Sequence, residues 1–500
     1  MQSIVRSIAI LIVMTLSTTF TARAEEAKSQ ENVLDDSWQV IYIQGKRVGY
    51  VHSLTWENGK GDDLRLWSES RTQMTIARFG GSLTMTVTQL TQEDADGNLV
   101  SFKLETDNPP ISHTLVTGEV KGDTLHLKTI SAGKTKESTQ TWDSDVKSPV
   151  YQDRMLEADP VNAGESRSMR VFDPQFLKIG TVTIAGLEPQ STELLDGSTP
   201  ELERVTISHS LVPVMKMTAY MNEAGETLKT ETNLLGMISY TVSREEALKE
   251  ISGAELDLAL ETLVKVNPIK DAHRQQKIVY DVSVDGPLEL LSIPEGETQS
   301  VETLDDHTIR LTVEALPLVP SQKTSAEPVD DGYLASSRYL ECGHSAVVAL
   351  AEKAAEGLTN PTDMSVAMER YVHDNLKSKN FSTALGTAAE VAVNLEGDCT
   401  EHAVLLAGML RAKGIPSRVA VGLVYVARLS AFGGHMWTEA YLDGRWVPLD
   451  STLGYGGIGA GHIKFADSSL SDDGPSPITA FVPLVSSLGK MKIEVVQPAE

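Results

Sequence analysis

Residues 435–450 read HMWTEAYLDGRWVPLD, and this stretch decides the fold of the C-terminal part of the chain. β-Forming residues stand on both sides of Asp443-Gly444, a strong signal for a two-residue hairpin turn. A turn at that position places Trp437 opposite Asp450. Because side chains alternate between the two faces of a strand, His435 shares the face of Trp437 and is a diagonal neighbour of Asp450. The hairpin therefore predicts an imidazole beside a carboxylate.

A second stretch, residues 397–413, predicts a helix with both ends marked. It reads GDCTEHAVLLAGMLRAK and is followed by Gly414, with a proline two residues further on. Asp398 is a good N-cap, and Glu401 stands three residues later, as a capping box requires. A glycine followed closely by a proline is typical of a helix end.

Cys399 falls at the first position of this helix. Free backbone N–H groups and the positive end of the helix dipole favour a thiolate there, which is the nucleophilic form. The same N–H groups could hold a developing oxyanion. The alternative is an inert structural cysteine, and the helix start alone does not decide between the two.

Taken together, Cys399, His435 and Asp450 form a candidate nucleophile, base and orienting group. Asp450 would fix the tautomer of His435 and stabilise the imidazolium, and His435 would take the proton of Cys399. The alternative is a surface hairpin with an incidental histidine–aspartate contact. His402, three residues after Cys399, is expected to fill the core or the rim of the site.

The N-terminal part of the chain is expected to be all-β, in long antiparallel meanders. Strand-forming runs from Trp38 to about Ser243 alternate with turn signals such as Asp96-Gly97 and Asp196-Gly197. Such spacing predicts a large antiparallel sheet or sandwich. Helical spacing then appears at 346–355, 364–376 and 387–395. The predicted fold class is therefore α+β and multidomain, with N-terminal antiparallel β domains before the helical segment.

The expected segments follow from these changes of pattern. Residues 1–24 have a positive start, a short apolar run and the cleavage site Ala22-Arg23-Ala24, which predicts a signal peptide. We therefore expect an exported protein, periplasmic or extracellular, without a transmembrane segment. The full division is 1–24 signal peptide, 25–36 flexible linker, 37–250 all-β domain, 251–330 small β domain, 335–460 catalytic core and 461–500 C-terminal extension.

The net charge and the cysteine count argue against some classes of ligand and partner. The formal net charge of −26 argues against nucleic acid, since phosphate binding needs clustered Lys and Arg. The two cysteines, Cys342 and Cys399, leave a disulfide open as an alternative for an exported chain. His344 lies two residues from Cys342, but two ligands do not make a metal site, so no metal is expected.

The blocks GDC at 397–399, GIPSR at 414–418, HMWTE at 435–439 and WVPLDST at 446–452 together resemble the bacterial transglutaminase-like family. The resemblance covers the helix, the hairpin and the strand between them, in the order cysteine, histidine, aspartate. It implies a papain-like α+β core with Cys399 as nucleophile, His435 as base and Asp450 as orienting group. It also implies a thioacyl intermediate formed on an amide carbonyl.

Three functions stay open at this point. The first is an exported cysteine-dependent acyl-transfer enzyme (a transglutaminase, peptidase or amidase) that acts on protein or peptide substrates. The second is a non-catalytic binding or scaffold protein of the cell envelope that uses the same core. The third is a redox-regulated protein with a Cys342–Cys399 disulfide. Animal members of the family use calcium. We do not expect calcium dependence in this chain, because no acidic cluster has calcium-ligand spacing, and no cofactor is expected.

Overall fold

A computed structural model describes residues 32–78, 81–108, 112–131, 134–250, 256, 262–316, 329–377, 386–472 and 477–498. The chain forms two compact units. The first holds Met1–Ala77 and Ser82–Leu256, and the second holds Arg78–Gly81 and Asp257–Glu500. The predicted signal peptide lies outside the described residues. None of the described helices has the length and apolarity needed to cross a membrane.

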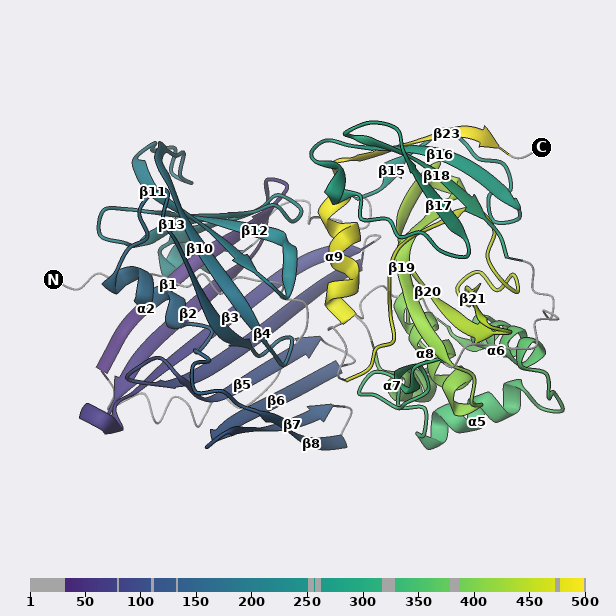
Figure 1. Cartoon of the computed structure of the whole chain (residues 1–500), viewed down its shortest axis with the longest axis horizontal. Helices are drawn as coiled ribbons and strands as arrows, with labels where there is room; N and C mark the ends of the chain where they lie inside the picture. Colours follow the sequence, from purple (N-terminus) through teal and green to yellow (C-terminus); the bar gives the residue numbers. More distant parts are fainter. Residues whose placement is uncertain are drawn as a thin grey trace. The chain divides into compact units, whose positions relative to one another are not determined.

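The first unit is one 14-stranded sheet, in the order β8-β7-β6-β5-β4-β3-β2-β1-β14-β13-β12-β11-β10-β9 (Figure 1). Two meanders, β1 to β8 and β9 to β14, are joined where β1 pairs antiparallel with β14. The predicted large antiparallel β region is thus confirmed. Its elements are β1 (Asn32–Ile43), β2 (Lys46–Asn58), β3 (Arg65–Arg78), β4 (Gly81–Asp94), β5 (Leu99–Asn108), β6 (Ser112–Lys121), β7 (Thr124–Ser131), β8 (Lys134–Thr141), α2 (Tyr151–Ala158), β9 (Ser166–Asp173), β10 (Lys178–Ser191), β11 (Glu201–His209), β12 (Val212–Met221), β13 (Thr227–Thr232), β14 (Met237–Val242) and α3 (Arg244–Ala247).

The start of β1 differs from the sequence-based expectation. Residues 32–36 were assigned to a flexible linker by their polar composition, but they belong to β1 and pair with β2. Asp35 is buried there, and it accepts a hydrogen bond of 2.8 Å from the hydroxyl of Ser37. Main-chain pairing with β2 and this buried hydrogen bond stabilise residues 32–36 as a strand, although their polar composition predicts a flexible linker.

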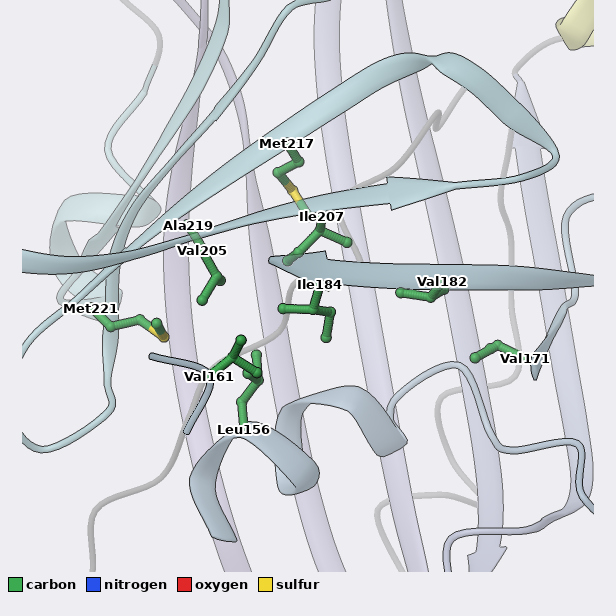
Figure 2. Close-up of a cluster of buried hydrophobic side chains, with 10 residues drawn as sticks. All are labelled: Leu156, Val161, Val171, Val182, Ile184, Val205, Ile207, Met217, Ala219 and Met221. Atoms are coloured by element: carbon green, nitrogen blue, oxygen red, sulfur yellow. The ribbon is translucent and has the colours of Figure 1, made fainter. Parts of the chain in front are cut away.

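The core of this unit includes two clusters of buried apolar side chains, one mainly on β9 to β12 and one mainly on β4 to β7. Leu156 of α2 and the following Val161 point toward Ile184 and Val205 of the strands (Figure 2). A second cluster packs around Phe172 and includes Leu125 and Trp142. Alternating burial along the strands supplies these side chains, for example in β10, where every second residue from Gly180 to Gly186 is buried. Strands of the two meanders therefore pack on one another, as Phe102 of β5 and Phe172 of β9 do with ring centroids 5.3 Å apart, and connecting segments add to this core.

The second unit combines helices with two antiparallel sheets. The larger sheet has the order β15-β20-β19-β22, with β21 paired to β20, and α8 packs on β20 (Figure 1). Residues 400–411 of α8 are all buried, so α8 is the central helix. The elements are β15 (Val264–Lys265), α5 (Ser345–Ala354), α6 (Pro361–Asn375), α7 (Ala388–Asn394), α8 (Cys399–Ala412), β19 (Ser417–Val426), β20 (Ala431–Leu442), β21 (Arg445–Leu449), β22 (His462–Ser468) and α9 (Pro477–Ser487).

The smaller sheet of this unit has four strands in the order β17-β18-β16-β23. These are β16 (Lys277–Val284), β17 (Gln299–Thr303), β18 (Thr308–Glu314) and β23 (Met491–Pro498). β16 pairs antiparallel with both β18 and the C-terminal β23. Strands that the sequence assigns to a small β domain and to a C-terminal extension therefore share one sheet.

Burial predicts a large stability difference between two leucines of the first unit. Leu125 is fully buried in the cluster around Phe172, whereas Leu195 is 40% exposed. Leu125→Ala should lower the free energy of unfolding of this unit by about 2–5 kcal/mol, because it leaves a cavity. Leu195→Ala, the matched control, should change it by less than about 0.5 kcal/mol. Urea unfolding followed by tryptophan fluorescence measures both, and equal losses would contradict the assignment of this core.

Candidate active site

The candidate nucleophile stands at the start of the buried central helix. α8 begins at Cys399, and the Asp398 carboxylate accepts a hydrogen bond from the N–H of Thr400. Glu401 reaches back to the N–H of Asp398 at 2.9 Å, which completes the predicted capping box. Gly397 has φ +146°, and a Cβ there would lie 2.3 Å from the Glu401 side chain. The contacts of the residues on either side of Cys399 therefore fix the position at which α8 begins.

The hairpin has the predicted register. β20 and β21 pair Leu442 with Arg445 and Thr438 with Leu449, and both turn residues, Asp443 and Gly444, have positive φ. Positive φ at both positions is the signature of the turn that matches strand twist. Asp450 follows β21 directly. The hairpin thus brings His435 and Asp450, which stand at its two ends, close together.

His435 and Asp450 make the predicted contact. Nε2 of His435 lies 2.9 Å from Oδ2 of Asp450, and both side chains are buried. A nitrogen that faces a carboxylate carries the proton, so Nε2–H donates to Asp450. The remaining ring nitrogen, Nδ1, is then the one that can serve Cys399, whose sulfur helps to raise the pKa of His435. The three predicted residues therefore interact within one site.

Two hydroxyl groups tie the hairpin to the helix. Thr438 of β20 donates to the carbonyl of Ala403 at 2.8 Å, and Ser451, just past Asp450, donates to the carbonyl of His402 at 3.1 Å. Both acceptors lie in the first turns of α8. These bonds fix the hairpin against the end of the helix that carries Cys399.

The charges of the site stabilise an imidazolium. Burial by itself lowers the pKa of His435, but the Asp450 carboxylate and the Cys399 sulfur more than offset this and raise that pKa to about 10. Burial likewise raises the pKa of Asp450, yet the imidazolium and the hydrogen bonds from two histidines hold it well below its usual value. His435 is therefore charged and Asp450 ionised at neutral pH.

Two further residues join the site that the sequence did not single out. His462, on β22, places Nε2 at 3.0 Å from the same Oδ2 of Asp450. Glu369, on α6, accepts the N–H of Asp450 at 3.1 Å and that of Gly457 at 3.4 Å. Neither has a local motif, and both reach the site from elements distant in the sequence.

The same cluster is where a metal ion could be held among the described residues. Ligand atoms of His435, Asp450 and His462 all lie within 4.8 Å of one another. The two Nε2 atoms, however, both donate to Asp450 here, and an ion would need them deprotonated. The donor set thus fits zinc by type, but its hydrogen bonds already satisfy the carboxylate.

Other residues near the site make structural contacts. His402 is buried and bonds the carbonyl of Asp398 at 2.6 Å. Trp437 is buried, with its ring roughly parallel to that of His435 at 6.2 Å. Glu439 pairs with Arg418 at 2.6 Å, on neighbouring strands. Cys342 and Cys399 are both free thiols, so the alternative disulfide is not formed in this structure.

A cysteine at the start of a central helix, facing a histidine–aspartate pair on an antiparallel sheet, defines a papain-like α+β core. Residues 348–451 match the family model of the transglutaminase-like superfamily core, so this part of the chain is a transglutaminase-like domain. The predicted family and fold class are thereby confirmed.

Three solved structures show limited similarity to the chain. The first is a proposed cysteine protease from Cytophaga hutchinsonii, with 15% identity, TM-score 0.28, and coverage of 44% of this chain and 81% of that one. A β-barrel-like domain of unknown function from Brucella abortus has 12% identity and TM-score 0.30, covering 42% and 95%. A proposed protease from Parabacteroides distasonis has 14% identity and TM-score 0.18, covering 68% and 63%. No curated protein matches the chain significantly.

The raised pKa of Glu369 leads us to expect that the free energy of unfolding depends on pH. Burial raises its pKa from 4.5 to about 7, so the folded state binds its proton more tightly than the unfolded state. Glu369 therefore costs stability progressively as the pH rises from about 4.5 to 7. Glu369→Gln keeps one carbonyl oxygen as acceptor and removes the titration. Its free energy of unfolding relative to wild type should increase by about 2–4 kcal/mol between pH 4.5 and pH 8.

Thermal or urea unfolding at several pH values measures this difference. Glu352→Gln, on the exposed side of α5, is the matched control and should follow the wild-type profile. A Glu369→Gln profile parallel to that of wild type over the whole range would show that the buried carboxyl does not titrate as expected.

Proposed function

We propose that this protein is an exported cysteine-dependent acyl-transfer enzyme that acts on amide bonds of protein or peptide substrates. The observation that carries the proposal is the buried hydrogen bond between His435 and Asp450, with Cys399 at the start of a capped helix and raising the pKa of His435. The transglutaminase-like domain supports it, since Cys399, His435 and Asp450 follow in the family's order. Export is supported only by the sequence of residues 1–24.

The chemistry follows from the two nitrogens of His435. The Cys399 thiolate attacks the amide carbonyl carbon, and the negative charge moves to the carbonyl oxygen, near the positive end of the α8 dipole. As the C–N bond breaks, Nδ1–H of His435 protonates the leaving amine. The products of this half-reaction are a thioester on Cys399 and a neutral imidazole that still donates Nε2–H to Asp450.

The second half-reaction restores the enzyme. Water or a primary amine attacks the thioester, and His435 removes a proton from the attacking atom through Nδ1. The carbon–sulfur bond breaks, Cys399 leaves as the thiolate, and the acyl group leaves as an acid or a new amide. Hydrolysis and cross-linking thus share every residue and differ only in the acceptor that reaches the thioester.

Thiol reactivity tests the proposed nucleophile. Because the His435 imidazolium supplies a counter-charge for a thiolate, Cys399 should react with iodoacetamide at pH 6.5 faster than Cys342 does. His435→Ala removes the counter-charge, and the alkylation rate of Cys399 at pH 6.5 should fall by at least about tenfold. Mass spectrometry of the alkylated peptides gives the rate.

Cys342 is an internal control for this measurement, since it is a free thiol 57 positions earlier on the same chain and its sulfur lies 4.0 Å from the carbonyl oxygen of Leu334. Its rate should not change in His435→Ala. Equal pH profiles for Cys399 in both proteins would instead favour a non-catalytic scaffold.

Substrate turnover tests the reaction itself. A set of glutamine-containing peptides, incubated with a fluorescent primary amine, should release ammonia in amounts that depend on Cys399. Asp450→Asn should lower kcat by about 10³- to 10⁴-fold, because the amide cannot stabilise the imidazolium or fix its tautomer. Label incorporation would indicate amine transfer, and ammonia without label would indicate hydrolysis. Peptide-bond cleavage is followed on the same samples by mass.

Activity that survives in Cys399→Ser or Asp450→Asn at the wild-type level would contradict the assignment of both groups. Circular dichroism of the variants excludes unfolding as the cause of any loss.

A further inference from the structure

His462 is a buried histidine beside the site, and the proposed reaction does not use it. It begins β22 and is 2% exposed. Its ring lies 5.9 Å from the ring of His435 and meets that of Trp437 edge-on at 5.3 Å. A polar side chain so deeply buried is expected to have a specific hydrogen-bond partner.

That partner is Asp450. Nε2 of His462 lies 3.0 Å from Oδ2, the same oxygen that His435 approaches at 2.9 Å. The other oxygen, Oδ1, accepts the N–H of Thr452 at 2.9 Å. The carboxylate is therefore held on both oxygens, and its rotation would break at least one of these bonds. Hydrogen bonds to a charged group are each worth about 1.5–3 kcal/mol.

A β-bulge brings His462 to this position. β19 and β22 pair Val421 with Ala466, but the register shifts by one residue, so that Gly422 pairs with Lys464 and Val424 with His462. Without the shift, Ile463 would face Val424 and His462 would point to the other side of the sheet, because a one-residue slip exchanges the faces. Bulges near functional sites re-aim side chains in this way.

Gly422 makes the shifted register possible. It pairs with His435 on the other side of β19, and a Cβ at this position would lie 1.9 Å from the carbonyl oxygen of Ile463. The two strands that flank β19 thus deliver one histidine each to the same carboxylate.

We propose that His462 is a positioning residue: as a neutral imidazole it donates Nε2–H to Asp450 and fixes the carboxylate so that His435 presents Nδ1 to Cys399. This inference rests on the proposed function and adds a fourth residue to its site. His462 touches neither the thiol nor the expected place of the substrate, so it acts through Asp450.

The charges around His462 agree with a neutral donor. Burial and the His435 imidazolium lower its pKa, and they outweigh Asp450 and a backbone hydrogen bond to Gly459, which act in the opposite sense. A second imidazolium would stand close to that of His435, and like charges at short distance disfavour the charged form of His462. Several titratable groups lie around His462. They are His273 in the segment before β16, Glu369 on α6, Cys399 on α8, His435 on β20 and Asp450 after β21.

The test compares two substitutions of His462 in the full-length protein. His462→Phe fills a similar volume without a donor, whereas His462→Gln can place an N–H₂ group near the position of Nε2. The measurement is the rate of Cys399 alkylation by iodoacetamide from pH 5 to pH 9. His462→Phe should shift the midpoint of this profile to higher pH and lower the rate at pH 6.5 by about tenfold. His462→Gln should remain within about threefold of wild type.

His273→Phe is the matched control. His273 is also a part-buried histidine, with its ring 5.6 Å from that of His462, but its Nε2 bonds the carbonyl of Tyr425. It should leave the alkylation profile unchanged. A purely structural role of His462 would lower the rate at all pH values without moving the midpoint, or would affect Phe and Gln equally, and either result overturns the proposal.

Two further outcomes separate this proposal from its alternatives. If His435→Ala lowers the reactivity of Cys399 but His462→Phe does not, the positioning role fails and the proposed function stands. If Cys399 reacts independently of His435, both fail together. If the wild-type protein loses reactivity on dialysis against EDTA and regains it with zinc alone, the cluster is a metal site and the positioning role is overturned.

Discussion

The ionised carboxylate of Asp450, fully buried inside the second unit, is the constraint on which the site depends. A buried charge is costly unless it is paired and hydrogen-bonded. Here two histidines converge on one oxygen, a backbone N–H holds the other, and the residue's own N–H is received by Glu369. The two histidines and Glu369 come from three different elements, β20, β22 and α6, so their contacts with Asp450 form only when these elements pack together. Stability and the geometry of the candidate site are therefore secured by the same contacts.

Burial of α8 has a similar double role. Its residues 400–411 are enclosed by the neighbouring helices and the sheet, and its N-terminus is where the backbone N–H groups have no acceptor within the helix. The capping box satisfies some of these groups with Asp398 and Glu401 and leaves Cys399 at the first position. A rigid, fully packed helix holds its first residue more precisely than a loop would. The hairpin then needs only to be fixed against this end, and Thr438 and Ser451 do so.

Much of this could be predicted from local signals. The helix of α8, its cap and the hairpin register follow from neighbours within a few residues, because turns, caps and strand alternation are short-range effects. The contact of His435 with Asp450 was predictable for the same reason, since one hairpin carries both. The strand of residues 32–36 was not, because its polar side chains are accommodated by pairing with β2 rather than by an apolar pattern.

The sequence by itself thus determined the transglutaminase-like character of residues 348–451, the cysteine at a helix start and the histidine–aspartate pair, since each depends on order along the chain. Only the tertiary structure decided that His462 and Glu369 belong with them. His462 reaches Asp450 because a bulge changes the register of β22 against β19, and Glu369 does so because α6 packs beside the loop after β21. Neither a bulge nor the packing of a distant helix has a signature in the residues that carry the side chains, because both are set by partners that the fold brings into contact.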